Sequence, residues 1–217
     1  MSQTFTPRLD ILPKPQQRLW PELSQLSASF TLYGGTAIAL QLGHRVSVDF
    51  DFFALEPIDT GALYQNTSFL SGARIIQREA NTLTCIVERD GPVKLSFFGL
   101  PNLKRINAPL RTSDTNLPVA SLLDLAGTKA EVVQHRAAAK DYADIDALIS
   151  AGIDLRTHLQ AGRKVYGDVF VPIATVKALT YFDDGDLATL PPNVKARLAK
   201  AAADVDLLTL KQDGGHD

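Results

Sequence analysis

Two different hydrophobic periods divide the chain. Up to about residue 107, apolar and polar positions alternate over short runs bounded by glycine, proline, asparagine and aspartate, which is typical of strands. Beyond residue 118, apolar positions recur every three to four residues, which predicts helices. We therefore expect an α+β protein. A small mixed β-sheet with flanking helices (residues 1–110) would be followed by an α-helical C-terminal half (residues 111–217), with the boundary in the turn-rich segment Asn107–Pro118.

Short alternating runs predict the strands of the first half. In chain order these are Phe30–Tyr33, Val46–Phe53, Ala73–Arg78, Thr82–Glu88 and Val93–Phe98. The Asp90-Gly91 pair is a tight-turn signal, so the last two strands are expected to form a hairpin. Helices are predicted at Gln16–Leu26 and Thr36–Leu42, and after Thr60, which is expected to cap its helix.

The helices of the second half are predicted from the spacing of their apolar residues. They are Val119–Arg136, Lys140–Ser150, Leu155–Val165, Val171–Tyr181 and a last helix that Pro191-Pro192-Asn193 opens and that runs to about Lys211. Asp154 is expected to cap the third of them, and Asp213–Asp217 is expected to be a frayed tail.

Composition narrows the class of protein. A chain of 217 residues that is 45% hydrophobic can build one large domain or two small ones. Cys85 is the single cysteine, so no internal disulfide can form, which agrees with a reducing compartment. No apolar run approaches the length that spans a bilayer, and we expect a soluble, cytoplasmic protein. The net charge of −2 argues against general DNA or RNA coating, although a local basic patch could still grip one RNA end.

Candidate chemistry is concentrated between Tyr33 and Phe53. Two glycines permit a sharp turn before a short helix, and Gly43 ends that helix. In the strand that follows, alternation puts Asp49 and Asp51 on one face, roughly 7 Å apart at their Cα atoms. Two neighbouring carboxylates repel each other, so such a pair favours a bound cation.

A short Asp-x-Asp motif is by itself most simply explained as a solvated strand face. The glycine turn changes this interpretation. A helix that begins at Gly35-Thr36 directs backbone N–H groups and the positive end of its dipole toward the strand end. Carboxylates beside such a helix start form a cradle suited to magnesium and a triphosphate.

The pattern resembles a known family. Gly34–Leu40 reads Gly-Gly-Thr-Ala-x-Ala-Leu, and Gly43–Phe53 reads Gly-His-Arg-x-Ser-x-Asp-Phe-Asp-Phe-Phe. Both segments are similar to the signature of the AbiEii/AbiGii-type nucleotidyltransferase toxins, which belong to the DNA polymerase β-like nucleotidyltransferase superfamily. The resemblance implies that a metal-dependent enzyme moves a nucleoside monophosphate from an NTP to an acceptor hydroxyl.

The resemblance also assigns roles to residues. It implies that Gly34, Gly35 and Thr36 hold nucleotide phosphates, and that Asp49 and Asp51 hold Mg²⁺ or Mn²⁺ and are catalytic.

The segment between these two groups matches the same signature. Arg45 and Ser47 are interpreted as phosphate-binding or structural residues. For His44, a packed or hydrogen-bonded residue at a helix end is at least as good an interpretation as a catalytic role.

One expected residue is missing. The superfamily usually places a third carboxylate on a later strand, and here Val93–Phe98 carries Lys94 and Ser96 at the corresponding polar positions. Three carboxylates normally hold two metals and activate the attacking hydroxyl. With two, the protein would hold a single metal, use another base, or bind nucleotide without transferring it. Glu88 on the neighbouring strand is a weaker candidate for the missing acid.

A second signature follows in the helical half. Leu123–Lys129 resembles the family's Asp-x-Ala-x-x-Lys-like helix, and Arg136–Ile145 resembles its Arg-x-x-x-Lys-Asp-x-x-Asp segment. Such charges are common on helix surfaces, but two signatures in the right order favour the family. The resemblance implies catalytic roles for the residues Lys129, Lys140, Asp141 and Asp144. In it, the lysines act as mobile charges facing phosphates across a cleft. The aspartates would hold the lysines, act as a base, or merely favour a helix start.

Three hypotheses stay open at this point. The first is a toxin of a toxin–antitoxin or abortive-infection pair that uses an NTP, with a tRNA 3′ end as acceptor and a cognate antitoxin protein as partner. The second is a nucleotide-binding module that has the fold without turnover. The third is transfer to a small-molecule hydroxyl.

Overall fold

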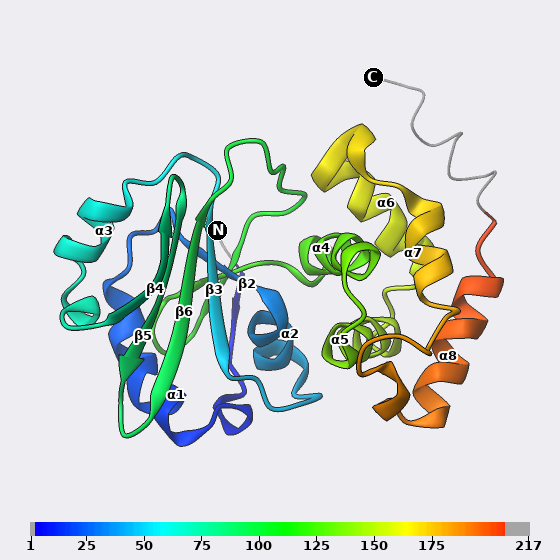
Figure 1. Ribbon diagram of the computed structural model, residues 1–217, viewed down its shortest axis with the longest axis horizontal. Coiled ribbons are helices and arrows are strands. Elements are labelled where there is room, and N and C mark those ends of the chain that lie inside the picture. Colours follow the sequence, from blue (N-terminus) through cyan, green and yellow to red (C-terminus); the bar gives the residue numbers. More distant parts are fainter. Residues whose placement is uncertain (1–2, 207–217) are drawn as a thin grey trace. The chain divides into compact units, whose positions relative to one another are not determined.

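The computed structural model describes residues 3–206 and separates them into two compact units (Figure 1). The first unit contains the chain up to Leu103 together with Asn107–Ser121, and the second contains Lys104–Ile106 and the chain from Leu122 onward. A mixed sheet dominates the first unit and helices dominate the second, which confirms the predicted α+β class. Within the described residues, no helix is long and apolar enough to cross a membrane.

The first unit is built on one sheet. In the described part of the chain the strand order is β1-β7-β8-β2-β3-β6-β5-β4. The strands are β1 (Thr4–Phe5), β2 (Thr31–Tyr33), β3 (Asp49–Ala54), β4 (Arg74–Glu79), β5 (Thr82–Glu88), β6 (Pro92–Gly99), β7 (Leu110–Thr112) and β8 (Pro118–Val119). The five predicted strands are all present, and β5 and β6 pair antiparallel as the Asp90-Gly91 turn predicts.

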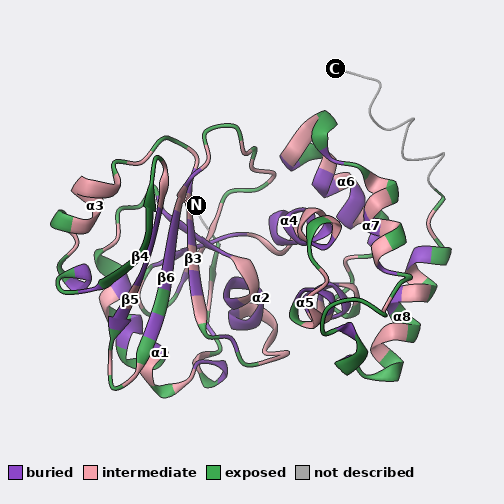
Figure 2. Ribbon diagram, viewed as in Figure 1, coloured by how far each residue is buried: buried purple, intermediate pink, exposed green. Residues whose placement is uncertain are grey.

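Strand β3 is central and alternates as predicted, but it is shorter. Phe50 and Phe52 are buried on one side, while Asp49 and Asp51 are half-buried on the other. In Figure 2 the ribbon of β3 accordingly carries both the buried and the intermediate colour. The predicted start at Val46 is wrong, because Val46 and Val48 lie exposed before the strand. Their apolar side chains continue the alternating pattern in sequence, yet none of the described strands pairs with them.

Helices cover the sheet of the first unit. Helix α1 (Lys14–Leu19) gives way to a 3₁₀ segment, η2 (Trp20–Gln25), instead of continuing to Leu26. The change coincides with Pro21, which cannot donate a helical hydrogen bond. The Trp20 ring packs against Phe50 with ring centroids 6.1 Å apart, so η2 covers the aromatic side of the sheet.

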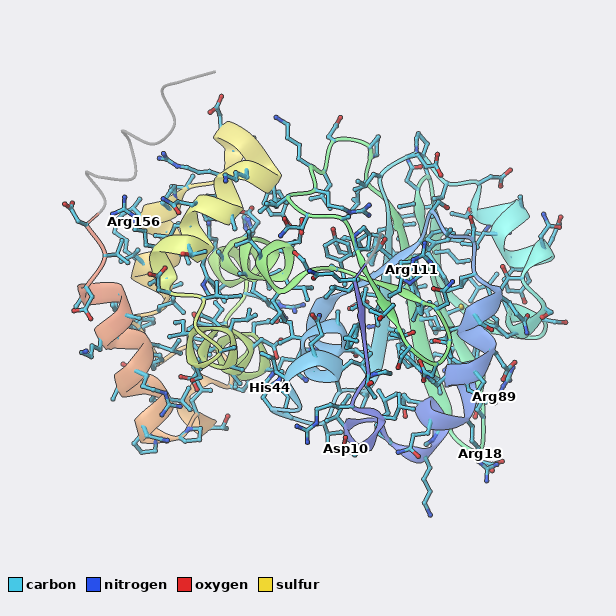
Figure 3. The ribbon with its side chains drawn as sticks, turned by 180° about the vertical axis from the view of Figure 1, so that it is seen from behind. Asp10, Arg18, His44, Arg89, Arg111 and Arg156 are labelled. Atoms are coloured by element: carbon cyan, nitrogen blue, oxygen red, sulfur yellow. The ribbon has the colours of Figure 1, made fainter. Side chains whose placement is uncertain are left out.

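Two ion pairs fasten this helical segment to the β5–β6 turn. Arg89 donates to both carboxylate oxygens of Glu22 at 2.6 and 2.8 Å, and Arg18 pairs with Asp90. Arg18 and Arg89 lie close together in the view of Figure 3. These contacts fix the N-terminal helices on the first unit.

The other two helices of this unit flank β2 and β4. Helix α2 (Gly34–Leu42) begins directly after β2 and ends at Gly43, whose positive φ of 68° is the left-handed cap expected there. Helix α3 (Thr60–Asn66) is capped by Asp59, which accepts hydrogen bonds from the backbone N–H groups of residues 61 and 62. Thr60 is therefore the first helical residue and not the cap. A short 3₁₀ turn, η3 (Ser68–Leu70), follows it.

The segment predicted as an inter-domain connection belongs to the sheet. Strands β7 and β8 pair with each other, and β8 continues parallel to β2. Asp114 in the turn between them accepts a 2.8 Å hydrogen bond from the Trp20 indole. The first compact unit consequently extends to Ser121, beyond the boundary expected at residue 110. Val119 lies in β8, so the next helix starts three residues later than predicted, at Leu122.

The second unit is helical. Its helices are α4 (Leu122–His135), α5 (Ala139–Ser150), α6 (Leu155–Tyr166), α7 (Pro172–Ala178) and α8 (Pro192–Ala203), with 3₁₀ turns η4 (Gly167–Val169) and η5 (Leu187–Thr189). Asp154 caps α6 as predicted, accepting from the backbone N–H of Thr157 at 2.8 Å. Helices α4 and α6 pack so closely at Gly127 that an added Cβ would lie 2.8 Å from the Ala161 backbone. The predicted end of the last helix near Lys211 and the tail Asp213–Asp217 lie outside the described residues.

Candidate active site

The start of α2 touches an acidic side chain of β3. Gly34 has a φ of 72°, which an L side chain rarely adopts, and a Cβ placed there would lie 2.8 Å from Oδ2 of Asp51. Glycine is therefore required both by the backbone angle and by the carboxylate beside it. Within the described residues, no side-chain hydrogen bond caps this helix start. The backbone N–H groups of the first turn thus open beside Asp51.

A buried hydroxyl pair ties the same helix to the start of β3. The Oγ1 of Thr36 lies 2.7 Å from the Oγ of Ser47 and also donates a short hydrogen bond to the backbone carbonyl of Asp49. Both side chains are buried. The Thr36 hydroxyl is consequently engaged inside the protein, and it fixes the position at which Asp49 enters the sheet.

The neighbours of the two aspartates follow from the strand register. Asp51 lies between Tyr33 on β2 and Ser96 on β6, and Asp49 lies opposite Lys94 on β6. Partners in a parallel pair point to the same face, so Ser96 occupies the position beside Asp51 at which a third carboxylate was sought. Ser96 is buried and cannot supply that charge.

Three further residues from the sequence analysis lie around this group. Arg45 is half-buried and donates to the backbone carbonyl of Val46 at 3.0 Å. His44 follows the left-handed cap of α2, as expected for a residue at a helix end. Glu88 pairs with Pro92 at the far end of β5, four residues and roughly 13 Å along the sheet from the Asp51 row. It is too distant to replace the missing acid.

The second signature forms a buried ion cluster within the helical unit. Nζ of Lys129 lies 2.6 Å from Oδ1 of Asp141 and 2.7 Å from Oδ2 of Asp144. The Lys129 side chain is only 6% exposed and the two aspartates are fully buried. The expectation of a mobile surface charge is therefore wrong for Lys129, which α4 and α5 hold between two carboxylates.

A fourth residue of this cluster was absent from the expected catalytic set. Arg136 donates to both carboxylate oxygens of Asp141, from Nε at 2.6 Å and from Nη2 at 3.0 Å. Burial raises the pKa of Asp141, but the hydrogen bond from Arg136 and the nearby Lys129 charge outweigh burial and hold this pKa below its ordinary value. Asp141 is therefore ionised at neutral pH. The contact of Arg136 with Asp141 could have been anticipated, because Arg136 is the first residue of the sequence segment that matches the family.

Lys140 differs from Lys129. It lies in the first turn of α5, and its side chain is exposed. Of the two lysines in the signature, Lys140 is thus the one whose charge faces solvent, whereas Lys129 is part of the packed interior.

The sequence as a whole matches one family. The pattern of the family described as "Nucleotidyl transferase AbiEii toxin, Type IV TA system" fits residues 18–209. The chain belongs to the AbiEii nucleotidyltransferase toxin family. It is a nucleotidyltransferase, and both the glycine turn of α2 and the buried ion cluster lie inside the matched region.

Relatives and solved structures agree with this membership. An uncharacterized protein of Aquifex aeolicus (strain VF5) is 33% identical over 158 residues, which cover 71% of this chain and 74% of that protein. MenT4, a nucleotidyltransferase toxin from Mycobacterium tuberculosis H37Rv, has a similar fold, with a TM-score of 0.58, 18% identity, and coverage of 89% of this chain and 84% of that one. A putative nucleotidyltransferase from H. pylori gives a TM-score of 0.50 at 16% identity, covering 94% and 97%. At these identities the two structures show the fold.

The AbiEii fold implies a divalent cation, and the donor set of this chain fits one. Carboxylate oxygens are the ligands that Mg²⁺ and Mn²⁺ prefer, and Mg²⁺ is commonly held by one or two carboxylates together with substrate phosphates. Among residues 3–206, no group of three or more His, Cys, Asp or Glu side chains forms a complete protein cage. Asp49 and Asp51, on one side of β3, match the case in which phosphates supply the remaining ligands.

Proposed function

We propose that this AbiEii-family enzyme transfers a nucleoside monophosphate from an NTP to an acceptor hydroxyl, using a divalent cation held by Asp49 and Asp51. The observation that carries the proposal is the contact between Gly34 and Asp51. It brings a metal-binding carboxylate and the N–H groups of a helix start to one place, as a metal–triphosphate complex requires.

Each residue of this group has a proposed role. The N–H groups of Gly34 and Gly35 bind phosphate oxygens, because the start of α2 carries partial positive charge. The phosphate role expected of Thr36 is confined to its backbone N–H, since its hydroxyl holds Ser47 and the Asp49 carbonyl. Thr36 and Ser47 are therefore positioning residues for Asp49. Arg45, half-buried after α2, adds positive charge near the phosphates.

The reaction follows from these positions. The acceptor oxygen bonds to the α-phosphorus, the bond from that phosphorus to the bridging oxygen of the β-phosphate breaks, and pyrophosphate leaves. The hydroxyl loses its proton to a base. When bound, Mg²⁺ or Mn²⁺ neutralises charge on the phosphates. Because Ser96 replaces the third carboxylate, we propose that one cation suffices and that the base is not on β6.

The residues of the second signature have proposed roles within the helical unit. Lys140 is exposed and suited to bind a phosphate or the leaving pyrophosphate. Lys129, Asp141 and Asp144 are proposed to keep the start of α5 rigid, so that Lys140 is presented in one place. In this view Lys140 contacts substrate and the other three residues position it.

The acceptor and the biological role rest on the family. Its description names a toxin in a toxin–antitoxin system, so we propose that the chain is a toxin whose activity a cognate antitoxin limits. The acceptor is proposed to be the 3′ end of a tRNA, whose blocking would stop translation. The negative net charge of the chain is compatible with a tRNA acceptor, because an enzyme that binds one RNA end needs only a local basic surface.

The test is transfer of label from each of four α-labelled NTPs to total RNA, to purified tRNA and to a small-molecule acceptor mixture, with Mg²⁺ or Mn²⁺. We expect label at the 3′ end of tRNA. Asp49→Asn and Asp51→Asn should each lower the transfer rate by on the order of 100- to 1,000-fold, because removing one charge-stabilising group costs this much. Glu88→Gln is the matched control and should keep the wild-type rate.

Three results would separate the alternatives. Label in small molecules alone would overturn the RNA acceptor and keep the enzyme chemistry. Thermal stabilisation by NTP without any product would replace transfer with nucleotide binding. Equal rates for Asp49→Asn and wild type would remove the proposed metal site.

A further inference from the structure

Strand β4 presents an open edge in the part of the chain that the structure describes. Among residues 3–206 it is the last strand of the sheet, paired with β5 on one side only, and all six of its residues are exposed. Ile75 and Ile76 are 40% and 50% exposed, although isoleucine is usually buried. An exposed edge strand offers a row of backbone N–H and C=O groups to another strand. The side chains of β4 therefore determine which other strand can pair with this edge.

A β-bulge changes which side chains of β4 share a face. Arg74 pairs with Ile86 and Ile75 with Cys85, but then Gln77, Arg78 and Glu79 pair with Thr84, Leu83 and Thr82, so Ile76 is the extra residue. Without the bulge, positions 74 and 79 would point to opposite faces, because they are an odd number apart. With it, Arg74, Gln77 and Glu79 share the face of Ile86, Thr84 and Thr82.

The resulting pattern is complementary to itself. If a second β4 lies antiparallel along the free edge, centred on Gln77, then Arg74 of each copy faces Glu79 of the other. Ile75 faces Arg78, whose aliphatic stem can cover it, and Gln77 faces Gln77. Every facing pair points to one face of the sheet, as strand pairing demands. We propose that β4 is a homodimer interface, in which two copies join their sheets edge to edge through a two-fold axis at Gln77.

Other registers are less favourable. A shift by two residues in one direction places the two Arg78 side chains opposite each other, and like charges in facing positions are destabilising. A shift in the other direction leaves Glu79 without a partner position. After a shift by one residue, the side chains in facing positions would point to opposite faces of the sheet. The charges of β4 therefore favour a second copy in one register and disfavour an unrelated neutral strand.

The size of the strand sets the strength of the dimer. Six residues bury less surface than the roughly 1,200–2,000 Å² of a stable interface, so the pairing is weak and reversible. A dissociation constant in the micromolar range or above is expected, and it should rise with salt, because two exposed Arg–Glu pairs contribute. This inference does not depend on the proposed chemistry, since β4 shares no residue with the acidic site.

The test is sedimentation velocity of the full chain from about 1 μM to about 500 μM. We expect a dimer fraction that grows with concentration. Arg74→Glu and Glu79→Arg should each raise the dissociation constant by on the order of tenfold or more, since each turns two attractive pairs into two repulsive ones. The double variant Arg74→Glu/Glu79→Arg restores the complementarity and should return the constant to near the wild-type value. Glu88→Arg, with the same charge change on β5, should dimerise like wild type.

Several outcomes would overturn the inference. They are a wild-type chain that stays monomeric throughout the series, single variants that dimerise as well as wild type, and a double variant no better than the singles. A measurement on the wild type covers the case in which a variant fails to fold. Hydrogen exchange at β4 amides should slow with rising protein concentration, and exchange that is independent of concentration would equally refute the interface.

Discussion

Lys129 shows what a buried charge requires of its surroundings. A lysine ammonium removed from water loses several kcal/mol of solvation, and only well-placed opposite charges recover it. Here two fully buried aspartates from α5 lie within 2.7 Å of Nζ, and Arg136 completes the neutralisation of Asp141. The cluster joins α4 to α5 by charge where most helices are joined by apolar packing.

We predict that Lys129→Met destabilises the protein by about 3–5 kcal/mol, because two carboxylates would be left buried with one cation fewer. Lys140→Met removes the same charge from the exposed side of α5 and should change stability by no more than about 0.5 kcal/mol. Urea unfolding followed by far-UV circular dichroism measures both. Equal effects of the two substitutions would mean that the Lys129 pairs contribute little.

His158 is a buried residue of another kind. Its side chain is inaccessible, Nδ1 lies 2.9 Å from the Asp154 carbonyl oxygen, and within the described residues Nε2 has no hydrogen-bond partner. Because a carbonyl oxygen only accepts, Nδ1 carries the proton in the neutral ring. A second proton on Nε2 would be a buried charge without an acceptor, and burial accordingly lowers the pKa of His158 to about 4.

This lowered pKa predicts acid sensitivity. Since the ordinary histidine pKa is about 6.5, the unfolded chain binds the proton first, and the contribution to stability is complete above about pH 6.5. It is lost as pH falls toward 4. Between about pH 7.5 and about pH 5 the loss should be about 2 kcal/mol. Urea unfolding at both pH values should show it in wild type and not in His158→Gln, and an equal pH effect in both proteins would contradict the assignment.

At the scale of elements, α2 and β3 form a unit whose order in the chain creates the site. Strand β2, the glycine start of α2 and β3 follow one another in the sequence, and β2 pairs antiparallel with β3 so that Tyr33 faces Asp51. The helix therefore begins beside the acidic side chain it needs. Thr36 then links the first turn of the helix back to the start of β3.

We predict that Gly34→Ala is more harmful than Gly72→Ala, although both glycines have positive φ, of 72° and 76°. Among the described residues, no atom lies within 4 Å of a Cβ added at Gly72, so its alanine variant carries backbone strain alone, about 1–2 kcal/mol. The Gly34 variant must also displace Asp51, which should cost about 1 kcal/mol more and abolish nucleotide transfer. Thermal unfolding and label transfer measure both effects. If Gly34→Ala still transfers the nucleotide, the position of Asp51 is not required for the reaction.

At the scale of the whole molecule, the two compact units are interleaved in sequence. The chain leaves the sheet unit at Leu103, contributes Lys104–Ile106 to the helical unit, and then returns to complete the sheet with β7 and β8. The short segment is bound there by Lys104 N–H to the Val165 carbonyl and by Ile106 N–H to Asp124. Neither unit is a continuous piece of chain.

This interleaving predicts a single unfolding transition, because neither unit can unfold without releasing chain that the other holds. Trp20 and Cys85, the single tryptophan and cysteine, both report on the sheet unit. The thiol is buried and burial raises its pKa to about 11, so it reacts slowly until that unit opens. Trp20 fluorescence, Cys85 labelling and helical circular dichroism should share one urea midpoint. Separate midpoints would show that the units unfold independently.

Local sequence rules predicted the elements well and failed at their ends. The glycine after Leu42, the Asp90-Gly91 turn and the Asp154 cap act within a few residues. The helix end, the hairpin and the helix start that they produce could therefore be predicted from the sequence. Strands β1, β7 and β8 are two or three residues long and carry no period of their own. They exist because neighbouring strands offer hydrogen bonds, which is information held elsewhere in the chain.

The candidate site was predictable in its composition more than in its arrangement. Residue spacing put Asp49 and Asp51 on one face, and the resemblance to the AbiEii family is confirmed. The engagement of the Thr36 hydroxyl with Ser47, and the burial of Lys129 between two aspartates, could not be read from spacing. Both depend on contacts between side chains more than ten residues apart.

The sequence by itself determined the α+β class, the family and the residue types of the site, because these follow from periodicity, turn residues and short motifs. Tertiary structure alone decided which polar groups are buried and what each one faces. Periodicity records only which side of an element is apolar. Whether a charge on that element is solvated, paired or left beside a carboxylate is fixed when the elements pack.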